Sequence, residues 1–231
     1  MNDSLHTQYG NAFGTGLAAE RQRVLRNTYW LLALSLVPTV LGAWIGVSTG
    51  FLAAMGHGAS MILFFVGAFG LMFVIEKTKN SSTGVLALLA FTFFMGLMLS
   101  RLLAAVLGYR NGASLIMTAF GGTAAIFFAM ATLATVIKRD LSGMGKFLFV
   151  GAIILMVAGI ANFFLQSSAL MLTVLVGMLG IFSAFMLYDV KRILDGGETN
   201  YISATLAIYL DIYNVFQSLL SILGIFGGDR D

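Results

Sequence analysis

The stretch YISATLAIYLDIYNVFQSLLSILGIF, residues 201–226, decides how this chain must fold. It is long enough to cross a bilayer as one helix, which needs roughly 20 predominantly apolar residues. It also carries Asp211, Asn214, Ser218 and Ser221, at spacings of three, four and three, and these spacings place all four on one helix face. A polar face turned toward lipid would lose its hydrogen-bonding partners. We therefore expect this helix to be enclosed by other helices.

The composition places the rest of the chain in the same environment. Of its 231 residues, 59% are apolar and only 10% are charged, whereas soluble domains carry about 25% charge. This excess of apolar surface predicts a polytopic membrane protein. The chain has no cysteine, which excludes disulfides and thiolate metal sites. Its basic residues are spread over several loops, so nucleic-acid binding is not predicted.

Seven stretches have membrane-spanning length, and they predict an all-α bundle of seven transmembrane helices. Their approximate bounds are 28–47, 59–75, 84–107, 113–137, 147–165, 168–188 and 201–226. We expect a transmembrane domain over 27–227, a polar N-terminal tail over 1–26 and a short C-terminal tail over 228–231. No feature of the sequence specifies an oligomeric state.

The distribution of Lys and Arg predicts the orientation of the bundle, because positive charge accumulates in cytoplasmic loops. Ten of the thirteen basic residues fall before the first predicted span or after the second, fourth and sixth. The other side has Arg110 and Arg230, and Arg101 lies in the outer part of the third span. The N-terminal tail is thus predicted to be cytoplasmic and the C-terminal tail external.

Asp189 and Asp211 are the acids in the last two predicted spans. A carboxylate in hydrocarbon costs at least a few kcal/mol, so ionisable residues there are usually functional. At 1.5 Å per residue, Asp211 lies roughly 14 Å into its helix, and Asp189 lies about 9 Å before the end of its own if that helix continues to Asp195. Helix tilt can close that difference. If the carboxyl groups meet, they would share a proton and titrate as a pair, or bind a cation such as calcium.

Other interpretations of these polar residues remain open. Asp189 could be an interfacial acid paired with Lys191 or Arg192, and Asp211 could serve only in structural hydrogen bonding. Arg101, Asn162, Tyr213 and Ser218 are predicted as groups that line a permeation path or support the acid pair. An intramembrane aspartyl protease also needs two facing aspartates, but its Gly-x-Gly-Asp and Pro-Ala-Leu motifs are absent. No catalytic site or resident cofactor is therefore predicted.

Several segments resemble a known family. They are VLRNTY at 24–29, GGTAAIFF at 121–128, ANFFLQ at 161–166, GGETNYI at 196–202, YN at 213–214 and SLLSILG at 218–224. Together they are similar to the Bax inhibitor-1 (transmembrane Bax-inhibitor motif) family, and within it to the bacterial YccA-like branch. The similarity runs from about residue 20 to the C-terminus.

The resemblance implies a bundle whose last helix is surrounded by the other six. It also implies two functions. Better-studied members are pH-sensitive calcium leaks with paired aspartates in the sixth and seventh spans, which Asp189 and Asp211 match, with Asn214 beside them. The YccA-like branch is instead linked to restraint of the membrane protease FtsH through the N-terminal tail. An unstructured tail over 1–26 would suit a protease that pulls on chain ends, and the expected location is the bacterial inner membrane.

Overall fold

The structure, a computed structural model, describes residues 3–228, and its side chains from residue 19 onward except that of residue 57. Its helices are α1 (Asp3–Thr49), α2 (Phe51–Ala54), α3 (His57–Thr78), α4 (Ser82–Leu107), α5 (Gly112–Val136), α6 (Met144–Leu165), α7 (Ser168–Leu194) and α8 (Tyr201–Gly227). No strand occurs between residues 3 and 228. Residues 229–231 of the expected C-terminal tail lie outside the described part of the chain.

Seven of these helices are long and apolar enough to cross a membrane, which confirms the predicted all-α bundle. The largest differences from expectation are the short α2 and the larger extents of α1 and α7, while the bounds of α3 to α6 differ from the predicted ones by at most three residues at either end. The sixth predicted span continues six residues beyond 188, to Leu194, so Asp189 lies inside a helix. The expected hairpin is present, because α6 ends at Leu165 and α7 begins at Ser168.

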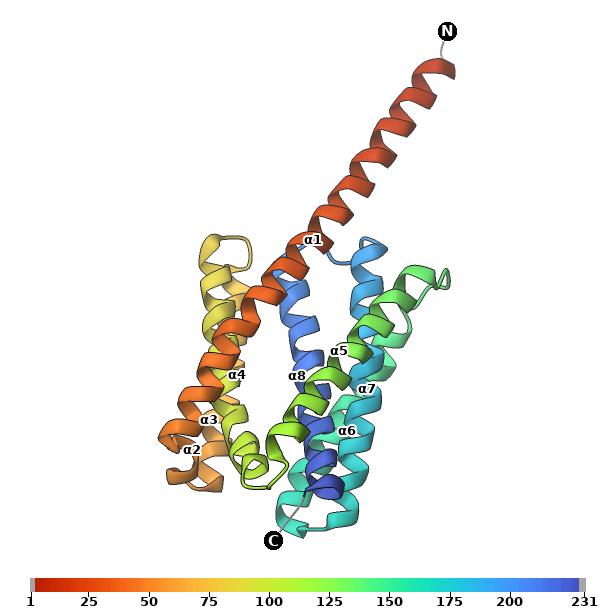
Figure 1. Cartoon of the computed structure of the whole chain (residues 1–231). Helices are drawn as coiled ribbons and strands as arrows, with labels where there is room; N and C mark the ends of the chain where they lie inside the picture. Colours follow the sequence, from red (N-terminus) through yellow and green to blue (C-terminus); the bar gives the residue numbers. More distant parts are fainter. Residues whose placement is uncertain (1–2, 229–231) are drawn as a thin grey trace.

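The prediction of an unstructured N-terminal tail is wrong for residues 3–26, which continue α1 as one helix. Figure 1 shows this N-terminal part of α1 projecting beyond the other helices. The sequence LAAERQRVLR at 17–26 consists mostly of strong helix formers. Adding residues to an existing helix is also far easier than nucleating a new one. The helix of the first span therefore continues toward the N-terminus through the polar segment that precedes the span.

Helix α8 contacts most of the other long helices of the bundle. It packs against α1, α3, α4, α5 and α7, whereas α6 packs chiefly against α7. Together with α4 it is the most buried of the long helices, and its buried residues include Ile208, Tyr209 and Leu220. Figure 1 shows α8 lying between α4 and α7. The prediction that all six other helices surround α8 stays a prediction.

The closest helix crossing joins α1 to α4. A Cβ built at Gly96 would lie 2.0 Å from the carbonyl oxygen of Thr39, and one at Gly42 would lie 2.1 Å from that of Phe93. Only glycine allows the two backbones to approach so closely, as is usual where membrane helices associate. α1 and α4 are thereby held together at the side of the bundle that α8 contacts.

Candidate functional site

Asp211 lies in the middle of α8 and is buried, with 4% of its surface exposed. Its Oδ2 atom has no hydrogen-bond donor among the described residues. A buried polar atom without a partner costs about 1–3 kcal/mol, and a charged one costs more. The position therefore requires a proton, a cation or a neighbouring group that can supply one.

That neighbouring group is Asp189. It lies on α7, five residues before the helix ends at Leu194, and it is partly buried. Its carboxyl group is within hydrogen-bonding reach of the Asp211 carboxyl group. The structure thus brings together the two acids that the sequence singled out. Carboxylates so close in a low-dielectric site cannot both be ionised cheaply, so a single proton shared between them is the economical arrangement.

The two basic residues that follow Asp189 form their ion pairs with other acids. The Lys191 ammonium instead lies 2.7 Å from Oδ1 of Asp195. The Arg192 guanidinium lies 3.5 Å from Oε2 of Glu198 and donates from Nε to the carbonyl of Gly197. Both basic side chains are engaged at the end of α7, and the side-chain partner of Asp189 is Asp211 of α8.

Two tyrosines attach the opposite side of α8 to α1 and α4. The Tyr209 hydroxyl lies 2.9 Å from the Thr39 hydroxyl on α1 and donates to the carbonyl of Thr92 on α4. The Tyr213 hydroxyl donates to the carbonyl of Met95 over 3.3 Å. The sequence predicted Tyr213 as a supporting group but gave no indication of Thr39, whose partner is 170 residues away.

Asn214 follows Asp211 by about one helical turn, and the remaining predicted polar groups lie further from the acid pair. The Asn214 amide donates to the carbonyl of Leu210 in its own helix, and Ser218 is buried about 10 Å further along α8. Arg101 is half-buried near the far end of α4. Asn162 accepts a hydrogen bond from the Ser167 backbone in the α6–α7 hairpin, almost the full length of α7 from Asp189. The structure gives Asn162 a local role in that turn.

The turn between α7 and α8 determines where both acids lie. Gly196 has a φ of 81°, which glycine adopts without strain. Asn200 caps α8 by accepting from the backbone of Ile202 and Ser203. Its Nδ2 also donates to the carbonyl of Lys79 and to Oδ1 of Asn80 in the α3–α4 turn. Asn200 thus fixes the start of α8 against a second turn at the same end of the bundle.

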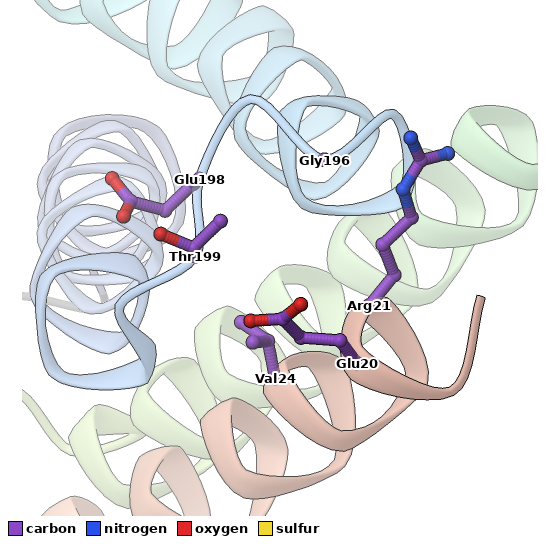
Figure 2. Close-up of a pocket in the computed structure, with 6 residues that line it drawn as sticks. All are labelled: Glu20, Arg21, Val24, Gly196, Glu198 and Thr199. Carbon is purple, nitrogen blue, oxygen red and sulfur yellow. The ribbon is translucent and has the colours of Figure 1, made fainter. Parts of the chain in front are cut away.

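A small pocket with a volume of about 70 Å³ lies between α1 and this turn (Figure 2). Its walls are Glu20, Arg21 and Val24 of α1 and Gly196, Glu198 and Thr199 of the turn. Arg21 donates to the carbonyl of Leu194, the last residue of α7, over 3.5 Å. Figure 2 shows Arg21 extending toward Gly196 while the Glu20 side chain points toward Thr199. The N-terminal arm of α1 therefore contacts the segment that joins the two acid-bearing helices.

The chemistry of the acid pair fits a proton better than a resident metal ion. Calcium prefers six to eight oxygen ligands, and the pair offers two carboxylates. Among the described residues, no group of three or more His, Cys, Asp or Glu side chains could hold a metal ion. These features define a polytopic helical membrane protein with a buried carboxyl pair between its last two helices.

Comparison with known proteins assigns the family. The sequence model of the family described as "Inhibitor of apoptosis-promoting Bax1" matches residues 21–228. The "Modulator of FtsH protease YccA" of Escherichia coli K12 is 40% identical, over 87% of this chain and 90% of its own. An uncharacterised protein of Neisseria meningitidis serogroup A is 39% identical over 90% and 93% of the two chains. An uncharacterised membrane protein of Vibrio cholerae is 40% identical over 89% and 91%.

The chain belongs to the Bax inhibitor-1 family, as the resemblance predicted, and its relatives include YccA. The YccA protein of a second Escherichia coli strain is named an inner membrane protein. With its seven spanning helices, the chain is a multi-pass protein of the bacterial inner membrane.

Proposed function

We propose that this protein is a pH-sensitive cation leak, with calcium as a permeant ion, and that Asp189 and Asp211 form its gate. The observation that supports the proposal most directly is the buried Asp211 carboxyl group: its Oδ2 has no donor among the described residues, and the Asp189 carboxyl group lies within hydrogen-bonding reach of it. One shared proton holds α7 against α8. Its loss leaves two negative charges at close range, and their repulsion separates the helices.

The proposal includes the expected topology. The N-terminus is cytoplasmic, the C-terminus is external, and α8 is the central helix. The acid pair then lies toward the cytoplasmic ends of α7 and α8, where a change of cytoplasmic pH reaches it first. A cation that enters between the separated helices relieves the repulsion and passes along the polar face of α8, with Asn214 and Ser218 beyond Asp211 and Arg101 further along the path.

Calcium flux into liposomes tests this proposal. The purified protein is reconstituted with an internal calcium indicator, and the rate of flux is measured over a range of external pH. Asp211→Asn supplies a permanent hydrogen-bond donor to Asp189 and removes the second charge, so we expect the pH dependence of the flux to disappear. Asp195→Asn is the matched control, because it also removes one acid near the end of α7 but one that pairs with Lys191.

The control should retain the wild-type pH profile. A robust flux whose pH dependence survives Asp211→Asn would contradict the proposed gate. A wild-type protein that passes no calcium at any pH would contradict the leak itself.

A second candidate function is modulation of the membrane protease FtsH. It is supported by the printed name of the 40% identical Escherichia coli relative and by the arm of α1 that projects beyond the bundle. In this proposal the arm is the recognition element, and it extends from the contact between Arg21 and the end of α7.

Deletion of residues 1–20 tests the second function. We expect the truncated protein to lose co-purification with FtsH and its effect on substrate turnover, while its thermal unfolding remains that of the full chain and its helix content falls only by the deleted part of α1. The full-length Asp211→Asn variant is the control that keeps the arm and alters the acid pair. If truncation left both co-purification and turnover unchanged, the arm would not be the recognition element.

A further inference from the structure

A groove of about 410 Å³ opens on the outer surface of the bundle where α1, α4 and α8 meet. It is lined by Asn27, Trp30, Leu31, Leu34, Val85 and Tyr201. The four α1 residues recur at the spacing of one helix face. Val85 lies in the first turn of α4, and Tyr201 is the first residue of α8. The groove therefore begins at the end of the bundle that holds the α3–α4 and α7–α8 turns and runs along α1.

The groove is polar at one end and apolar along its length. Asn27 and Tyr201 mark the polar end, whereas Leu34 lies seven residues deeper along α1, about 10 Å away. Trp30 is 73% exposed and Leu34 is 51% exposed, so the wall is open to the surroundings. In a helix that spans a bilayer, those surroundings are lipid. Tryptophan and tyrosine are also the side chains that prefer the level of lipid headgroups.

A basic side chain, Arg23, lies next to the polar end of the groove, on its N-terminal side along α1. Arg23 precedes Asn27 by four residues, so it lies on the same face of α1 one turn nearer the N-terminus, and it is exposed. None of the residues that line the groove is acidic. Basic side chains at the membrane surface attract anionic lipids, and each contributes on the order of 1 kcal/mol.

We propose that this groove binds one phospholipid of the bilayer with an anionic headgroup. An acyl chain packs along Trp30, Leu31 and Leu34. The headgroup phosphate lies beside Arg23, and the amide of Asn27 and the hydroxyl of Tyr201 can donate to it. The site is separate from the acid pair and does not depend on either proposed function. A bound lipid there would join the surfaces of α1, α4 and α8 at the end where the turns meet.

Tryptophan quenching tests the proposal, because the chain has only two tryptophans. In a Trp44→Phe variant, Trp30 is the sole reporter in the groove. The variant is reconstituted in vesicles of unbrominated phosphatidylcholine. Increasing fractions of one quencher are then included, either phosphatidylglycerol with brominated acyl chains or phosphatidylcholine with brominated acyl chains. We expect half-quenching at a phosphatidylglycerol fraction about fivefold lower than for phosphatidylcholine, the effect of one basic residue at a membrane surface.

Arg23→Gln should remove that preference, so that both brominated lipids quench Trp30 equally. Arg139→Gln is the charge-matched control, because Arg139 is an exposed basic residue of the α5–α6 loop, and it should leave the preference intact. In the reciprocal Trp30→Phe variant, Trp44 is 14 residues further along α1, and its quenching should not respond to Arg23→Gln. Equal quenching of Trp30 by both lipids in the parent protein would overturn the proposal, as would a preference that survives Arg23→Gln.

Discussion

Gly96→Ala is expected to break the packing of α1 against α4 and to lower the stability of the bundle by about 3 kcal/mol or more, the upper range for overpacked helix interfaces. The added methyl group would lie 2.0 Å from the carbonyl oxygen of Thr39 and 3.0 Å from the backbone nitrogen of Ala43. Both are backbone atoms, so no side-chain rotation relieves the overlap. The helices must move apart, and that movement also pulls Thr39 from Tyr209.

Unfolding of the purified protein in a titration with sodium dodecyl sulfate, followed by tryptophan fluorescence, measures this effect. Gly121→Ala is the matched control, since a Cβ at that position of α5 meets no atom within 4 Å. Alanine favours the helix over glycine by up to about 1 kcal/mol, so the control should be unchanged or slightly more stable. Equal stability of the two variants would contradict the close crossing of α1 and α4.

Asn200→Ala is expected to lower stability by about 2 kcal/mol, because one side chain serves three purposes. It caps α8 through the backbone of Ile202 and Ser203, a contribution of about 1 kcal/mol. It also donates to the carbonyl of Lys79 over 3.0 Å and to Asn80 over 2.9 Å, at about 1 kcal/mol or less for each bond. Alanine removes all of these contacts together.

Asn200→Asp separates the cap from the link between the turns. Aspartate keeps the oxygen that accepts from the helix backbone but has no amide to donate to Lys79. Its loss of stability in the same unfolding titration should therefore be smaller than that of Asn200→Ala. A loss of the same size in both variants would show that the link to the α3–α4 turn carries the effect and the cap does not.

The sequence predicted the helices well because their cause is local in the chain. Each span is a continuous apolar stretch, and the hairpin between Leu165 and Ser168 leaves no room for any other connection. Asp189 and Asp211 could also be recognised from the sequence, because an acid in such a stretch stands out by its cost. The two carboxyl groups come together because α7 continues to Leu194. The apolar pattern alone predicted that this helix ends earlier, at residue 188.

The features that the sequence did not predict are contacts between distant segments. The tightest helix crossing uses Gly42 and Gly96. Such a contact requires the relative rotation of α1 and α4, which no single helix encodes. The partner of Tyr209 was hidden for the same reason, because Thr39 is an ordinary polar residue in a span. The helical arm of α1 differs from the prediction because polar composition alone does not distinguish a solvated helix from a disordered tail.

The placement of α6 gives the acid pair a connection to the lipid phase. α6 is the least buried of the seven long helices, and it packs chiefly against α7, which carries Asp189. Bilayer thickness and lateral pressure act on such a lipid-exposed hairpin, and a mismatch in thickness costs fractions of a kcal/mol per ångström. Any tilt that they impose on α6 reaches the rest of the protein through α7. A change in membrane thickness that tilts α6 therefore acts on α7, and through α7 on the position of the Asp189 carboxyl group.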